Sequence, residues 1–115
     1  MTNNTKMNAE TIVVCIKQVL GRYPDICLAI LFGSLSKGQA GRDSGLDVAV
    51  DMGRPLVVQK KINLIAELAE ATGRPVDLVD LRVVGEPLLG QIIVTGLRIL
   101  GDDMSFAFML SKHLY

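Results

Sequence analysis

The sequence is poor in aromatic residues: it has no tryptophan, two tyrosines and three phenylalanines. Half of its 115 residues are nevertheless hydrophobic, so any core that forms must be mostly aliphatic. A chain of this length has room for one core, which this composition can fill without disulfides. We therefore expect residues 1–115 to form a single domain.

The sequence also lacks an excess of basic residues and a hydrophobic run long enough for a membrane. Lys and Arg together number 12, as do Asp and Glu, which argues against direct nucleic-acid binding. The longest unbroken apolar run, residues 26–32, is too short to cross a bilayer, and the polar N-terminal segment has no secretory signal. Cys15 and Cys27 lie in apolar stretches, where buried, reduced thiols are expected. These features predict a cytoplasmic protein that does not bind membranes.

Hydrophobic periodicity and end signals predict four helices: one that follows Asn8 and ends near Gly21, and three over residues 57–72, 86–96 and 104–115. Asn8 is the expected N-cap of the first helix, and Gly73 closes the second. The second and fourth helices each have an apolar stripe that we expect to be buried. In the second helix it comprises Val58, Ile62, Ile65 and Ala69, flanked by Leu64 and Leu68, and in the fourth it comprises Met104, Phe108 and the apolar residues of 110–114. The tail "FAFML" could pack on the core or on a second protomer, which leaves a homodimer open.

The segments between these helices have the pattern of strands, over residues 25–33, 46–52, 75–81 and 97–101. The first is continuously apolar, which is typical of a strand buried on both faces. The second alternates, so we expect it to be half-buried, with Asp47 and Asp51 on its polar face. The resulting order predicts an α/β (α+β) domain, a small mixed β-sheet flanked by helices.

The first strand ends in Gly33-Ser34, a pair that suits the binding of a phosphate group. Glycine lets the chain turn sharply and leaves room for an anion to approach the backbone amides. The Ser34 hydroxyl lies at the start of a helical turn, and Lys37 adds a positive charge one turn later. The same residues also fit an ordinary turn, so alone they do not define a site.

Two carboxylates lie near the starts of neighbouring predicted strands: Asp47 in the second and Asp77 in the third. If these strands pair, both side chains could converge on one Mg²⁺, which prefers oxygen ligands and commonly takes one or two carboxylates plus substrate phosphates. Such an ion would align an attack on the α-phosphorus of a nucleoside triphosphate. Each Asp taken alone also fits a solvent-facing residue. Asp51 lies too far along the strand to join the site, and Asp80 is expected at the surface or in a salt bridge.

Residues 31–50, "LFGSLSKGQAGRDSGLDVAV", closely resemble the signature of the minimal nucleotidyltransferases (MNT proteins) of the DNA polymerase beta superfamily. That signature is Gly-Ser, ten intervening residues, and then Asp-x-Asp. Here residues 35–44 separate Gly33-Ser34 from Gly45, which stands where the first Asp is expected, and Asp47 matches the second. Asp77 matches the third carboxylate of the family, and further family positions are matched by Lys37, Gly38 and Ser44.

The resemblance implies a polymerase-beta-like nucleotidyltransferase fold and a set of functional residues. Gly33, Ser34, Lys37 and Ser44 would bind the nucleotide, ATP. Asp47 and Asp77 would be the catalytic residues that bind Mg²⁺ during transfer of a nucleoside monophosphate, AMP, to an acceptor hydroxyl. Stand-alone members this short resemble prokaryotic MNT antitoxins, which pair with HEPN-domain toxins and in some systems adenylylate a tyrosine of the toxin. The expected partner is therefore a HEPN-domain protein.

Two positions depart from the family pattern. Gly45 supplies no carboxylate, which removes a metal ligand and predicts slower transfer. Asp43, two residues upstream, is a candidate substitute, and Leu35 stands where active members commonly have Arg. The sequence thus leaves two functions open: an active nucleotidyltransferase, or a catalytically degenerate member that acts by binding a nucleotide or a partner. His113, the only histidine, lies near the chain end and is not expected to be catalytic.

Overall fold

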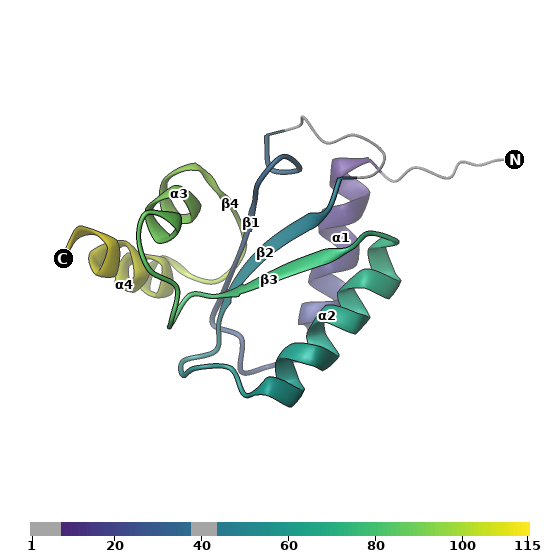
Figure 1. The fold of residues 1–115 in the computed structure, drawn as a ribbon, viewed down its shortest axis with the longest axis horizontal. Coiled ribbons are helices and arrows are strands. Elements are labelled where there is room, and N and C mark those ends of the chain that lie inside the picture. Colours follow the sequence, from purple (N-terminus) through teal and green to yellow (C-terminus); the bar gives the residue numbers. More distant parts are fainter. Residues whose placement is uncertain (1–7, 38–43) are drawn as a thin grey trace, which may run out of the picture.

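The computed structural model describes residues 8–37 and 44–115. In this part of the chain four helices and four strands follow one another in the predicted order (Figure 1): α1 (Ala9–Leu20), β1 (Leu28–Phe32), β2 (Leu46–Asp51), α2 (Val58–Thr72), β3 (Val76–Asp80), α3 (Leu88–Thr95), β4 (Leu97–Leu100) and α4 (Asp103–Leu114). The Asn8 side chain accepts a hydrogen bond from the Thr11 amide, and Gly73 ends α2 in the left-handed conformation, so both end signals are confirmed. Asp43 and Gly38 lie outside the described residues.

The strands form one mixed sheet in the order β3-β2-β1-β4. β1 pairs antiparallel with β2 and with β4, whereas β2 and β3 are parallel. A parallel pair needs a crossover connection, and α2 provides it. The predicted fold class, a small mixed sheet flanked by helices, is therefore confirmed.

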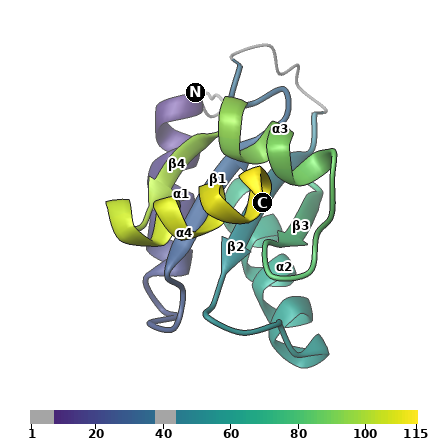
Figure 2. The ribbon, with the colours of Figure 1, turned by 90° about the vertical axis from the view of Figure 1, so that its left-hand side faces the viewer.

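Helices cover both faces of the sheet (Figures 1 and 2). α1 and α2 lie on one face and α3 and α4 on the other. Each pair of helices closes a separate aliphatic core against the sheet. The buried residues that α1 and α2 share with the sheet include Ile12, Ile16, Leu64, Leu68, Leu31, Val48 and Val50, and the second core includes Leu28, Ile30, Ala49, Leu89, Ile92 and Met109.

The second core overturns two expectations about polar strand residues. β2 is not half-buried, because α3 and α4 cover the face on which a solvated Asp51 was expected. Asp51 is only 2% exposed and Asp80 only 8%. Both are structural residues at the end of the sheet away from the predicted phosphate turn.

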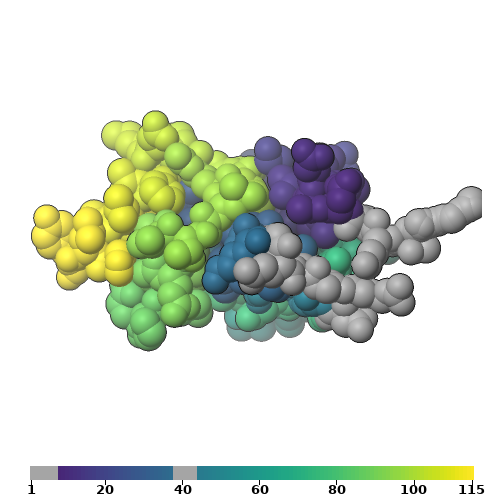
Figure 3. All heavy atoms as spheres, turned by 90° about the horizontal axis from the view of Figure 1, so that it is seen from above, coloured from purple at the N-terminus to yellow at the C-terminus, as the bar shows by residue number. Residues whose placement is uncertain are grey.

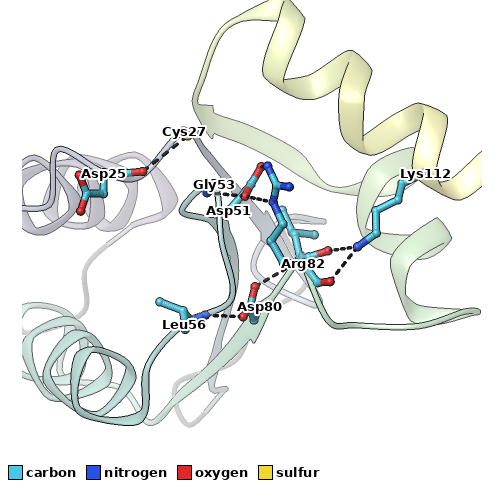
Figure 4. Close-up of polar contacts among 9 residues, drawn as sticks. Asp25, Cys27, Asp51, Gly53, Leu56, Asp80, Arg82 and Lys112 are labelled. Carbon is cyan, nitrogen blue, oxygen red and sulfur yellow. Dashed lines mark hydrogen bonds and ion pairs between the residues drawn. The ribbon is translucent and has the colours of Figure 1, made fainter.

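The buried carboxylates bind the two connections that leave β2 and β3 (Figure 4). Asp51 accepts hydrogen bonds from the Arg82 guanidinium Nε at 2.7 Å and from the Gly53 amide at 2.8 Å. Asp80 accepts from the amides of Leu56 at 2.8 Å and Arg82 at 2.9 Å. The prediction that Asp80 is a surface or salt-bridge residue was thus wrong, since backbone donors satisfy its carboxylate.

The predicted helix stripes were also partly wrong. α2 buries Leu64, Leu68 and Thr72, while Val58 and Ile62 are 75% and 53% exposed. α4 packs on the second core through Met109, with Phe106 and Leu110 beside it, and exposes Met104, Phe108 and Leu114. Periodicity found both helices, and the flanking residues Leu64 and Leu68 are buried as expected, but the centre of each stripe was misplaced because each helix carries more apolar residues than its neighbours can cover. A homodimer through the exposed residues of α4 stays a prediction.

The cysteines differ from expectation in burial. Cys15 is half-buried on α1, and Cys27 is exposed just before β1. An apolar run therefore did not mark a buried thiol here: Ile26 and Leu28 on either side of Cys27 are buried, while Cys27 itself is exposed.

Candidate functional site

A tight turn follows β1 at the edge where β2 and β3 begin. Gly33 has a φ of +77°, a left-handed conformation that glycine adopts without steric cost. The Ser36 hydroxyl donates to the Gly33 carbonyl at 2.8 Å, and the Lys37 amide donates to the Ser34 carbonyl at 3.2 Å. The predicted single turn after Ser34 is therefore present, and it places Lys37 one turn after the glycine.

Asp47 and Asp77 lie side by side on neighbouring strands. They are register partners in the parallel ladder between β2 and β3, and Phe32 of β1 is the antiparallel partner of Asp47. Partners in a ladder project their side chains to the same face, and neighbouring strands lie about 4.8 Å apart. The structure thus brings together the two carboxylates that the sequence placed on separate strands.

The two carboxylates form an electrostatically unfavourable pair. Burial, and secondly the charge of Asp77, raise the pKa of the Asp47 carboxyl above its ordinary value. Within the described residues no Lys or Arg forms an ion pair with either group. A bound cation would relieve this repulsion.

The turn and the carboxylate pair belong to one site. A Cβ atom added to Gly33 would overlap the Asp47 carboxylate, so no other residue fits at this point without displacing Asp47. A cavity of about 420 Å³ opens beside this contact and is lined by Phe32, Gly33, Lys37, Leu88, Gln91 and Thr95. Its volume falls in the range of small-molecule binding sites. In Figure 3, which views this end of the molecule, the blue turn after β1 lies beside the green surface of α3.

Sequence reasoning missed the contribution of α3 to the cavity. Leu88, Gln91 and Thr95 recur at helical spacing and share one face of α3, which was the available signal. Only the packing of α3 on the sheet brings that face to the turn after β1.

Position 45 is structurally able to accept an aspartate. Gly45 is not among the glycines with positive φ, and a Cβ there would lie 3.4 Å from the Pro75 carbonyl oxygen, an ordinary contact. Side chains two residues apart on a strand share a face, so an aspartate at position 45 would project beside Asp47. The missing carboxylate is therefore a difference in sequence and not a constraint of the backbone.

The remaining predicted residues have separate surroundings. The Ser44 carbonyl accepts a hydrogen bond from Arg74 at 2.8 Å, which ties the start of β2 to the end of α2. Leu35, where active members commonly have Arg, is buried in the first core and does not line the cavity. His113 pairs with Glu86 at 2.6 Å, where α4 meets α3.

The donor set fits one hard divalent cation. Within residues 8–37 and 44–115 no group of three or more acidic, histidine or cysteine side chains surrounds a metal position. Two carboxylates nevertheless suffice for Mg²⁺ when substrate phosphates and water supply its other oxygen ligands. Asp47 and Asp77 would hold such an ion, with Asp43 outside the described residues.

Comparison with known proteins defines the class. Residues 15–105 match the family model described as "Polymerase beta, Nucleotidyltransferase". The chain therefore belongs to the polymerase beta nucleotidyltransferase family, and the predicted resemblance is confirmed.

Particular relatives narrow the comparison. The chain is 37% identical to the protein adenylyltransferase MntA of Shewanella oneidensis over 95 residues. This matched region covers 80% of this chain and 68% of that protein. It matches a chain of a crystal structure of a toxin–antitoxin with AMP-PNP, with a TM-score of 0.82 and 31% identity over 89% of this chain and 83% of the other. It also matches a chain of a tri-AMPylated Shewanella oneidensis HEPN toxin in complex with MNT antitoxin, with a TM-score of 0.77 and 27% identity over 92% and 83%.

None of the helices that the structure describes is long and apolar enough to span a bilayer.

Proposed function

We propose that this protein is an MNT-type antitoxin that transfers AMP from ATP to a hydroxyl group of a HEPN-domain toxin. One observation carries the proposal: Gly33, whose turn suits a phosphate, both contacts the Asp47 carboxylate and lines a cavity of about 420 Å³. Similarity to an adenylyltransferase and to toxin–antitoxin complexes supports the reaction and the class of partner. We place both partners in the cytoplasm, where ATP is available.

Each residue of the turn and the carboxylate pair has a role in this reaction. The backbone amides at Gly33 and Ser34, with the Lys37 ammonium, bind the triphosphate and offset its charge. Ser44 contacts the nucleotide from the start of β2. Asp47 and Asp77 bind Mg²⁺, which when present neutralises phosphate charge and orients the α-phosphorus.

The transfer itself exchanges one phosphorus–oxygen bond for another. The acceptor hydroxyl oxygen forms a bond to the α-phosphorus, the bond from that phosphorus to the oxygen bridging to the β-phosphate breaks, and the hydroxyl proton passes to water. Pyrophosphate leaves toward Lys37, whose positive charge stabilises it. The residues of the turn and the carboxylate pair therefore act by positioning the reactants and by electrostatic stabilisation.

Gly45 is the observation that favours a second function, neutralisation of the toxin by binding alone. Its lack of a carboxylate predicts slow transfer, since each 1.4 kcal/mol added to the barrier costs about tenfold in rate. Similarity to an adenylyltransferase favours transfer.

The test is transfer of radiolabelled AMP from Mg²⁺-ATP to a candidate HEPN protein. We expect the native protein to label the toxin, and Asp77→Asn to lose that activity while still folding, because Asp77 is exposed. Asp25→Asn is the matched control, since Asp25 is an exposed carboxylate that pairs with Arg54 and Lys60 away from the cavity. A tight complex with the toxin but no labelling would contradict transfer and support neutralisation by binding.

A further inference from the structure

The cavity beside the turn has two chemically different ends. Gly33 and Lys37 form one end, which the proposed function assigns to the triphosphate. The other end is formed by one face of α3, with Leu88, Gln91 and Thr95. The reaction proposed above leaves this second end without a role.

Two apolar side chains, Phe32 of β1 and Leu88 of α3, and one uncommitted amide line the cavity beyond the turn. The Phe32 ring and the Leu88 side chain are each partly buried and pack against the second core. The Thr95 hydroxyl is already committed, because it donates to the Gln91 carbonyl at 2.6 Å. Within the described part of the chain, the Gln91 side-chain amide has no hydrogen-bond partner, and it borders the cavity.

We infer that this end of the cavity holds the nucleobase and that the Gln91 amide selects adenine. The inference rests on the proposed function, because a triphosphate at Gly33 and Lys37 leaves the α3 end as the part of the cavity open to the nucleoside. A primary amide presents a donor beside an acceptor, which matches adenine, whose N6 amino group donates beside the N7 acceptor. Guanine presents two acceptors at the same edge, O6 and N7, so it leaves the amide oxygen facing an acceptor.

The apolar residues complete the recognition. An aromatic ring and an aliphatic side chain contact the faces of any base and therefore supply affinity without selectivity. Phe32 and Leu88 have this role, so the choice between adenine and guanine falls to Gln91. Discrimination by one bidentate pair amounts to roughly 5- to 150-fold in affinity.

The test compares three ligands in the presence of Mg²⁺: ATP, GTP and inorganic tripolyphosphate, which has no base. Dissociation constants are measured by calorimetry for the native protein, Gln91→Ala and Gln91→Glu. We expect the native protein to prefer ATP to GTP within the range given above, and Gln91→Ala to bring the ratio of the two constants close to one. Gln91→Glu should invert the preference, because a carboxylate accepts hydrogen bonds from the guanine N1 and N2 groups. Tripolyphosphate should bind the native protein and Gln91→Ala equally.

The matched control is Gln18→Glu, the same change at an exposed position of α1, which covers the opposite face of the sheet. It should bind all three ligands as the native protein does.

An unchanged ratio of ATP to GTP binding in Gln91→Ala would overturn the inference and leave the proposed function intact. Equal weakening of all three ligands would also overturn it, since that places Gln91 on the phosphates. If Gln91→Ala lost AMP transfer while its dissociation constants for ATP and GTP were unchanged, the inference would be overturned and the α3 end would be assigned to the acceptor. If the native protein bound neither ATP nor tripolyphosphate, the proposed function itself would fail.

Discussion

Gly33 and Asp47 are in direct contact across the β1–β2 pair, and the space between them has no room for a single extra carbon atom. The turn that suits a phosphate and the carboxylate that suits a metal ion are therefore positioned by the same contact. A change at Gly33 must alter both.

We expect Gly33→Ala to reduce stability and to abolish nucleotide binding. The left-handed conformation alone costs a non-glycine residue about 1–2 kcal/mol, and the overlap with Asp47 adds to this. Gly73→Ala is the control, because Gly73 has a similar φ of +69° but no atom within 4 Å of an added Cβ. Urea unfolding and ATP calorimetry should show two destabilised variants, of which only Gly33→Ala fails to bind ATP. Equal ATP binding by both would show that the contact has no functional importance.

Gly45→Asp should raise the rate of AMP transfer by an order of magnitude or more. The backbone accepts the side chain, and the new carboxylate would project beside Asp47 and provide a further oxygen ligand for Mg²⁺. Gly45→Asn has the same shape without the charge and should not show the gain. Equal rates for the native protein and Gly45→Asp, measured with labelled ATP, would mean that Asp43 or water already fills this role.

Asp47→Asn should stabilise the protein free of metal at neutral pH. The raised pKa of Asp47 means that the folded protein binds this proton more tightly than the unfolded chain. The associated stability is fully present below the unfolded pKa and is lost as the pH rises through the folded pKa, so the ionised group opposes folding at pH 7. Thermal unfolding in EDTA should therefore show a higher midpoint for the variant at pH 7, and a smaller difference at about pH 3. A lower midpoint at pH 7 would show that the Asp47 charge is stabilising.

Asp51→Asn should lower the free energy of unfolding, although Asp51 has no role in the proposed catalysis. Asp51 is almost fully buried and accepts from Arg82, but the Arg82 side chain is 28% exposed and lies over the Phe108 ring, so we expect a loss smaller than the about 3–5 kcal/mol of a fully buried ion pair. Arg82→Met combined with Asp51→Asn should recover part of the loss. Arg54→Ala, which removes an exposed ion pair with Asp25, should cost no more than about 1 kcal/mol. Urea unfolding measures the stability of all of these variants. If the losses of Asp51→Asn and Arg82→Met simply added in the double variant, the two residues would not be coupled and the pairing would be contradicted.

Much of the fold could be predicted from local signals. The Asn8 cap, the left-handed Gly73 and the continuous apolar run of β1 each reflect a requirement met within a few residues. The burial of Asp51 could not be predicted, because alternation in β2 shows which residues share a face but not what covers that face. α3 and α4, which come later in the chain, cover it.

The same division holds for the candidate site. Gly33-Ser34 and Asp47 belong to one continuous signature, so the sequence alone determined the family and the candidate site residues. The sequence likewise determined that position 45 has no carboxylate. Only the tertiary structure decided that Asp47 and Asp77 are register partners, that Gly33 contacts Asp47, and that Gln91 faces the same cavity. These relationships depend on sheet pairing and on helices packing over both faces of the sheet, which no local sequence pattern records.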